Sequence, residues 1–143
     1  EFGEFRLDVW RDVIFDEHHF SLTKGSPEKV DVPMVRVQTQ SVLQDTLGID
    51  EIGKKWSIRK SLQKISEVGT GVFVLINHRD AKTYWLSSLK DENIEPKRNR
   101  RVIGIGSQIL RSLGLSRINV LGTPTKYSGL SGFNIEIEGF IDE

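Results

Sequence analysis

The fold of this chain is decided by residues 57–76, whose sequence is SIRKSLQKISEVGTGVFVLI. Ser57 can cap a helix, and Gly69 is suited to ending it. Between them, apolar residues recur at the spacing of one helical face: Ile58, Leu62 and Ile65. The apolar run 71–76 follows at once and predicts a strand that is buried on both faces. The stretch therefore predicts a helix over 57–68 that leads directly into a central strand.

Strand-like and helix-like segments alternate along the rest of the chain. We expect two strands within 2–24, a turn at 24–27, a strand at 32–37, a brief helix or turn at 41–48, an amphipathic piece at 82–89, a helix at 103–113, and strands at 118–121 and 133–138. The polar segment 91–101 is expected to be a loop. Helices placed between buried strands predict an α/β or mixed α+β fold, with helices packed on a central mixed sheet. Strands 72–76 and 118–121 should form its centre.

The composition excludes several classes of protein. The chain has 143 residues, 20 Lys and Arg, 20 Asp and Glu, and no cysteine. Its length suits one domain over residues 1–143. Zero net charge argues against a globally basic nucleic-acid or membrane binder, and no apolar run approaches the ~18 residues of a membrane span. Without cysteine there is no disulfide and no thiolate metal site. The chain begins at Glu1 without a methionine or a signal peptide, so we expect a cytoplasmic piece of a longer polypeptide.

Two glycines in the segment 104–106 (Gly-Ile-Gly) invite comparison with a dinucleotide-binding loop. The third glycine of that motif would fall at Ile109, and the segment does not follow a predicted strand. We expect instead that the small residues let the second helix pack closely.

The segment 16–19 (Asp-Glu-His-His) contains side chains that bind metals. Neighbouring side chains on a strand point to opposite faces, so His18 and His19 cannot easily chelate one ion together. His78 is a possible third ligand, but no spacing recommends it. We expect a turn with surface histidines here.

Two segments could bind an anion. The first is the basic cluster Lys97, Arg98, Arg100 and Arg101, whose guanidinium groups match phosphate oxygens. Its alternative is a solvated loop that Asp91, Glu92 and Glu95 partly neutralise. The second is the turn 123–126 (Thr-Pro-Thr-Lys), which offers two hydroxyls and an ammonium at the carboxyl end of a predicted strand.

Taken together, these segments resemble one enzyme family, GTP cyclohydrolase II. Residues 103–115 (IGIGSQILRSLGL) resemble its segment YGIGAQILRDLGV, and residues 120–130 (VLGTPTKYSGL) resemble LLTNNPTKYxGL. Residues 133–137 (FNIEI) resemble its GYGLEIVER end. Fainter similarities reach the front of the chain at 2–5 (FGEF), 19–25 (HFSLTKG) and 35–37 (VRV), so the resemblance covers essentially the whole chain.

The resemblance implies a chemistry that this chain lacks the residues to perform. The family opens the imidazole ring of GTP, releasing formate and pyrophosphate, as the first step of riboflavin synthesis. It uses a zinc ion that three cysteines hold and that activates a water molecule. Ser41 stands at the first cysteine position, and the other two positions fall near Ile52 and Lys54. We therefore expect no zinc and no other cofactor.

The resemblance also implies which binding residues are retained. The family's Asp-x-Arg pair aligns with Asn99 and Arg101, and an amide cannot act as a base. The family's RQEGRGIGL stretch aligns with residues 77–82, where its glycines and Glu-Gly-Arg are missing. The residue types that face phosphate are kept at Arg36, Arg101 and Lys126, and at Thr123 in a turn one residue shorter. These four are the predicted remnants of a phosphate or nucleotide site, with no catalytic residue among them.

In many bacteria this family forms the C-terminal half of a bifunctional chain. The N-terminal half is 3,4-dihydroxy-2-butanone 4-phosphate synthase, a lyase of the same pathway, and degenerate cyclohydrolase halves are a known variant. The resemblance thus implies a catalytically dead domain with a structural, dimerisation or regulatory role, fused to a synthase and homodimeric. Two alternatives stay open: a nucleotide or phosphate sensor, and a zinc-independent enzyme that processes GTP. Neither a nucleic acid nor a membrane is expected as a partner.

Overall fold

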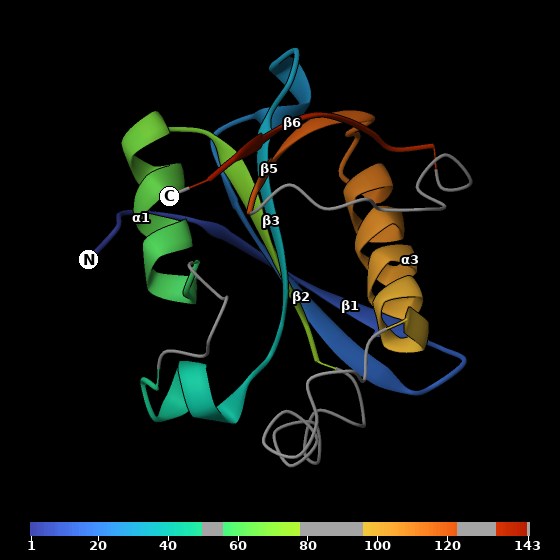
Figure 1. Cartoon of the computed structure of the whole chain (residues 1–143). Helices are drawn as coiled ribbons and strands as arrows, with labels where there is room; N and C mark the ends of the chain where they lie inside the picture. The colour runs from blue at the N-terminus through green and yellow to red at the C-terminus, as the bar shows by residue number, and fades with distance from the viewer. Residues whose placement is uncertain (50–55, 78–95, 123–133, 143) are drawn as a thin grey trace.

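The structure is a computed structural model that describes residues 1–49, 56–77, 96–122 and 134–142, with backbone alone for 96–100 (Figure 1). The strands are β1 (Arg6–Asp12), β2 (Glu17–Lys24), β3 (Met34–Thr39), β4 (Gly71–Ile76), β5 (Arg117–Leu121) and β6 (Glu136–Ile141). The helices are α1 (Ile58–Val68) and α3 (Pro96–Ser112), with a short 3-10 helix η1 (Pro27–Lys29) and a single turn of π-helix η2 (Val42–Thr46). The predicted alternation of strands and helices is confirmed within the described residues, whereas the predicted amphipathic piece at 82–89 and the turn at 123–126 lie outside them.

The described strands form one six-stranded sheet in the order β1-β2-β4-β3-β5-β6. β2 pairs antiparallel with both β1 and β4, whereas β4, β3, β5 and β6 pair parallel to one another. The sheet is therefore mixed, as predicted. β3 and β4 lie at its centre, so the prediction of a central strand is confirmed for 72–76 and wrong for 118–121, because β5 lies between β3 and the last described strand, β6. Because β2 is antiparallel to β4, the first residues of β2 lie at the carboxyl ends of the parallel strands.

The two helices cover opposite faces of this sheet (Figure 1). On one face, Ile109 and Leu110 of α3 pack with Val72 and Val74 of β4. On the other face, Ile65 of α1 packs in a second cluster of buried residues, which also holds Met34, Trp56, Phe73 and Leu121. Consecutive residues of β4 thus enter different layers, which confirms that this strand is buried on both faces. Neither helix, within the described residues, is both long and apolar enough to cross a membrane.

Helix α1 has the two ends that the sequence predicts. The Ser57 hydroxyl accepts a hydrogen bond from the Lys60 N–H at 3.2 Å, so it satisfies a donor of the first turn. Gly69 ends the helix in the left-handed conformation, with φ of 87°. That conformation is costly for a residue with a Cβ, which explains why the helix ends at this glycine.

Two predicted boundaries were wrong. Helix α3 begins at Pro96, seven residues before the predicted start at Ile103, so the segment predicted as a polar loop contains its first turns. A proline fits the first position of a helix, since the N–H that it lacks would have no partner there. Strand β6 begins at Glu136, because Asn134 adopts a positive φ of 57° that interrupts extended backbone. It continues through Gly139 and Phe140 past a β-bulge, in which Glu138 is the extra residue of β6 between the partners of Ile118 and Asn119.

Candidate functional site

The four predicted phosphate-facing residues do not form a common described site. Arg36 lies in β3 and Arg101 in α3, whereas Thr123 and Lys126 lie outside the described residues. Arg36 is paired in register with Phe73, whose side chain belongs to the core layer of α1. Arg101 belongs to the helix on the opposite face. The sheet therefore separates the two arginines, and each has its own set of contacts within the protein.

Arg101 is held by two residues of the β1–β2 hairpin. Its Nη2 donates a hydrogen bond to Oε1 of Glu17, a carboxylate whose side chain is only 3% exposed. On the other side, the Arg101 guanidinium lies 3.8 Å from the centre of the Phe15 ring, within the range of a cation–π interaction. A buried carboxylate that accepts from a guanidinium offsets its charge. The residue predicted to face phosphate is thus occupied by a side chain of its own chain.

His19 extends this cluster. Its side chain is 1% exposed, its Nδ1 accepts the Asn77 N–H at 3.0 Å, and its Nε2 lies 3.8 Å from Oε2 of Glu17. The predicted opposite orientation of the two histidines is confirmed, because His18 is exposed. The predicted surface position of His19 was wrong. Strand β2 already begins at Glu17, so alternate residues from Glu17 onward point into the layer beneath α3.

Sequence reasoning missed the roles of Glu17 and Phe15. The signal that could have revealed Glu17 is the alternation of its strand, in which every second residue is buried (Glu17, His19, Ser21 and Thr23). A buried glutamate demands a cationic partner. The sequence does not say which cation, because Arg101 is 84 residues away.

Arg36 serves to join segments of the protein backbone. Its Nη1 donates to the Leu121 carbonyl at 2.9 Å, and its Nη2 donates to the Trp56 carbonyl at 3.3 Å. Both Nε and Nη2 also lie within 3.4 Å of the Gln38 side-chain oxygen. These contacts tie the end of β5 to the segment that precedes α1. Arg36 therefore has a structural role that requires no anion.

Ser41, at the first position where the family carries a cysteine, is the cap of the turn η2. It is buried, and its hydroxyl accepts the Gln44 N–H at 3.4 Å. Its own N–H donates to Oδ2 of Asp45 at 2.8 Å. A hydroxyl is a poor substitute for the thiolate that zinc prefers, and this one faces a backbone donor. Within the described ranges, no three His, Asp or Glu side chains gather as a metal site would require. These residues do not fit the zinc that the resemblance implies.

The glycines of segment 104–106 lie inside helix α3 and not at its start. A Cβ at Gly106 would meet Cγ1 of Val37 at 3.0 Å, closer than ordinary contact. The predicted close packing is confirmed. The basic cluster at residues 97–101 lies in the first turns of α3, but apart from Arg101 its side chains fall outside the described part.

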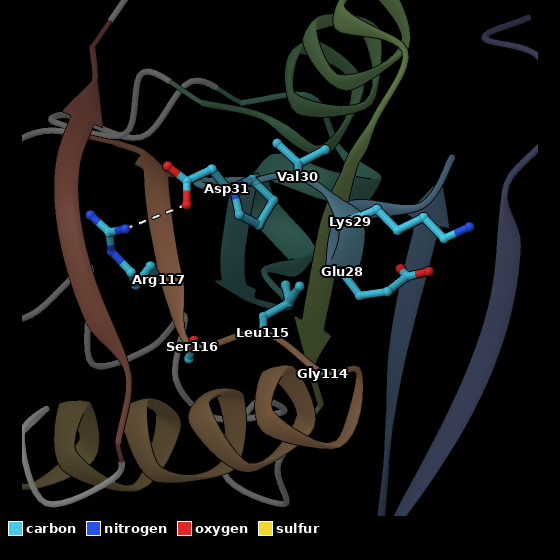
Figure 2. A pocket seen from close by; sticks show the side chains of 9 residues that line it. Glu28, Lys29, Val30, Asp31, Gly114, Leu115, Ser116 and Arg117 are labelled. Carbon is cyan, nitrogen blue, oxygen red and sulfur yellow. Dashed lines mark hydrogen bonds and ion pairs between the residues drawn. The ribbon is translucent and has the colours of Figure 1, made fainter.

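A cavity of about 400 Å³ lies at the end of the sheet opposite to Arg101 and Glu17, where β5 begins and α3 ends (Figure 2). Glu28, Lys29, Asp31 and Arg117 line it, and Arg117 pairs with Asp31 across 3.4 Å. Arg117 also donates to Glu138 at 2.8 Å, and this hydrogen bond is the main reason that its pKa is raised. The cavity carries two acidic and two basic residues, so it does not match the anion site that the sequence predicts.

The chain thus has a mixed α+β fold in which two helices cover a mixed six-stranded sheet, and Arg101 pairs with Glu17 beside the carboxyl ends of the parallel strands. The family described as GTP cyclohydrolase II matches residues 1–142, and the chain belongs to that family.

The relatives are proteins of riboflavin biosynthesis that are longer than this chain. A 3,4-dihydroxy-2-butanone 4-phosphate synthase of Pseudomonas aeruginosa is 30% identical over 99% of this chain and 40% of its own length. The riboflavin biosynthesis protein RibBA of Cytophaga hutchinsonii is 30% identical over 94% of this chain and 37% of its own. A crystal structure of RibBX, a two-domain 3,4-dihydroxy-2-butanone 4-phosphate synthase from A. baumannii, matches with a TM-score of 0.70 at 26% identity, over 100% of this chain and 37% of that one. The chain thus spans about two-fifths of the length of these relatives.

Proposed function

We propose that this chain is a GTP cyclohydrolase II-like domain without cyclohydrolase activity, which serves as a structural or regulatory domain beside a 3,4-dihydroxy-2-butanone 4-phosphate synthase. The observation that carries the proposal is the engagement of Arg101 by Glu17 and Phe15. A guanidinium already neutralised by a buried carboxylate is not available to a triphosphate unless that pair is broken. Breaking it would leave a buried charge without a partner.

The donor set supports the loss of zinc. The chain contains no cysteine, and Ser41 uses its hydroxyl to cap a turn. Zinc in such sites is bound by deprotonated thiolate, imidazole or carboxylate groups. His19, the buried imidazole of this region, already accepts a backbone N–H through Nδ1. We infer that the protein works without this metal.

The general base of the family is replaced as well. Asn99 stands where the resemblance places an aspartate, and an amide neither takes up nor releases a proton near neutral pH. Without a base and without a metal-activated water, hydrolytic opening of a purine ring lacks both of its usual sources of a nucleophile. The chain does retain the core residues that pack on both faces of β4, and these residues maintain the fold.

The longer relatives supply the reason for a synthase partner. Several of them are described as 3,4-dihydroxy-2-butanone 4-phosphate synthases, although this chain covers only about two-fifths of each. The solved relative is described as having two domains. We place this chain in the position of the second domain, with a homodimer as its working state.

The proposal is tested by measuring metal content and turnover of the 143-residue chain. Elemental analysis should find zinc far below one ion per chain, and incubation with GTP and added zinc should release no formate. Stoichiometric zinc, or formate release that disappears in the variant Arg101→Ala, would overturn the loss of activity. The structural role is tested on a longer chain that carries the synthase before this domain, compared with the same chain lacking residues 1–143. We expect the synthase to melt at a lower temperature without this domain, and an unchanged melting midpoint would contradict that role.

One observation favours a second candidate, a phosphate or nucleotide sensor. Oε2 of Glu17 and Nε of Arg101 are buried and lack a hydrogen-bond partner within the described part of the molecule. A ligand phosphate could satisfy Nε by displacing the carboxylate. A thermal-shift titration with GTP, FMN and pyrophosphate in EDTA distinguishes the two functions. A saturable shift that is lost in Arg101→Ala would establish the sensor, whereas no shift with any of the three would leave the structural role.

A further inference from the structure

Strand β1 forms one edge of the sheet. In the strand order β1-β2-β4-β3-β5-β6 it has β2 on one side, and no described strand lies on the other. An edge strand presents unpaired N–H and C=O groups that can pair with another strand. β1 is seven residues long and contains no proline, so its backbone can form such a ladder.

The apolar side chains of β1 are unusually exposed. Leu7 is 58% exposed and Val9 is 56% exposed, on the face of the sheet that they share with Leu22 and Phe20 of β2. Of the ten large apolar residues that are exposed in the described part of the chain, five fall between residues 7 and 15: Leu7, Val9, Val13, Ile14 and Phe15. Val13, Ile14 and Phe15 belong to the turn that joins β1 to β2, so the exposed apolar side chains of the edge strand itself are Leu7 and Val9. Exposed apolar side chains beside an unpaired strand edge mark an interaction surface.

The pattern of β1 is complementary to itself. In an antiparallel pair with a second copy, centred on Leu7, Arg6 lies opposite Asp8 of the other copy and Phe5 lies opposite Val9. Each charge then meets its opposite on one face, while Phe5, Leu7 and Val9 of both copies form a continuous apolar row on the other. Opposite charges placed directly across two strands stabilise the pair.

Other registers are less favourable. A shift that centres the pair on Arg6 sets two arginines against each other, and one that centres it on Asp8 sets two carboxylates against each other. A shift by a single residue places Arg6 beside Leu7 of the other copy, so the polar and apolar rows no longer match. Within one chain, Nε of Arg6 already donates a hydrogen bond to Oδ2 of Asp8 at 3.0 Å. Pairing of two β1 strands extends this contact into a row of alternating charges.

We infer that two copies of this chain associate through β1, in antiparallel register around Leu7, so that the two sheets become continuous. This inference deepens the structural role proposed above by naming the surface that carries it. The surface lies outside the region of Arg36, Ser41 and Arg101. A different occupant of the edge, such as a strand of the synthase, is an outcome of the test below.

Charge reversal tests the register. Light scattering should give the chain twice the mass of one copy, and Asp8→Arg should yield a monomer because it places arginines opposite each other. The double variant Arg6→Asp/Asp8→Arg restores opposite charges and should restore the dimer. Circular dichroism verifies that each variant folds. The inference would be overturned if the wild-type chain is a monomer at every concentration, or if Asp8→Arg leaves the dimer intact. If the wild-type chain is a monomer and Asp8→Arg weakens its binding to the synthase, the edge strand belongs to the interface with the synthase.

Disulfide capture gives an independent test, because the chain contains no cysteine of its own. In this register Leu7 faces itself across the twofold axis, so Leu7→Cys should form an intermolecular disulfide on mild oxidation. Val13→Cys is the matched control, since Val13 is 79% exposed but lies outside the paired stretch. We expect the first variant to cross-link about tenfold faster or more. Equal rates would refute the register, and neither result depends on the assays of zinc or formate.

Discussion

Arg101 of α3 donates a hydrogen bond to Glu17, the first residue of β2, and the glutamate side chain is almost completely buried. The contact joins two segments that are 84 residues apart. It also occupies the guanidinium that the sequence assigns to a phosphate. One ion pair thus links α3 to the β1–β2 hairpin and gives the Arg101 guanidinium a partner within the chain.

Breaking this pair on one side should be costly. Arg101→Met leaves the Glu17 carboxylate buried without its cation, and we expect a loss of roughly 3 kcal/mol in the free energy of unfolding. The double variant Glu17→Leu/Arg101→Met removes both charges and should recover most of that loss. Urea unfolding measures all three proteins. As a control, Arg117→Gln removes an exposed arginine, so its small effect should vanish in high salt. Equal losses in the single and double variants would contradict the pairing.

Arg36 should matter for stability and not for anion binding. Arg36→Ala leaves the Leu121 and Trp56 carbonyls without the donors that reach them at 2.9 and 3.3 Å. We expect a loss of about 1–3 kcal/mol, with little recovery in Arg36→Lys because an ammonium cannot span both acceptors. Arg59→Ala removes an exposed arginine of α1 and serves as the control. Unchanged stability together with weaker binding of pyrophosphate would reverse this assignment.

The two adjacent histidines should behave differently. His19→Ala opens space in a buried layer and leaves the Asn77 N–H without its acceptor, so we expect a loss of about 2–4 kcal/mol. His18→Ala changes an exposed side chain and should stay within roughly 0.5 kcal/mol of the wild type. Thermal and urea unfolding of the two variants provide the comparison. Similar effects from both would mean that β2 does not bury alternate residues as described.

Gly71 should tolerate alanine poorly. A Cβ at this position would lie 2.9 Å from the Met34 carbonyl oxygen and 3.1 Å from a side-chain carbon of Ile65. Because strand and helix are both fixed by the core, we expect Gly71→Ala to cost about 2–3 kcal/mol. Gly48 also has a positive φ, but nothing lies near its missing Cβ, so Gly48→Ala should cost only about 1 kcal/mol. Calorimetry of the two variants would measure the difference, and the reverse order would argue against the packing of α1 on β4.

The parts of the fold that follow from local patterns were predictable. Helix α1 has its cap at Ser57 and its end at Gly69 because both depend on neighbours within a few residues. The burial of β4 on both faces follows from an uninterrupted apolar run. The start of α3 at Pro96 was not predicted, since the same polar residues suit a loop or the exposed turns of a helix.

Residue identity and spacing are enough to show that this chain has a helix-and-sheet fold of the GTP cyclohydrolase II family and no thiolate to hold zinc. The contacts of the retained arginines, in contrast, depend on the tertiary structure. It set Arg36 and Arg101 on opposite faces of the sheet and gave Arg101 a carboxylate from a distant hairpin. Charge pairing depends on which strands lie side by side, and the order of the strands is fixed by packing of the whole core.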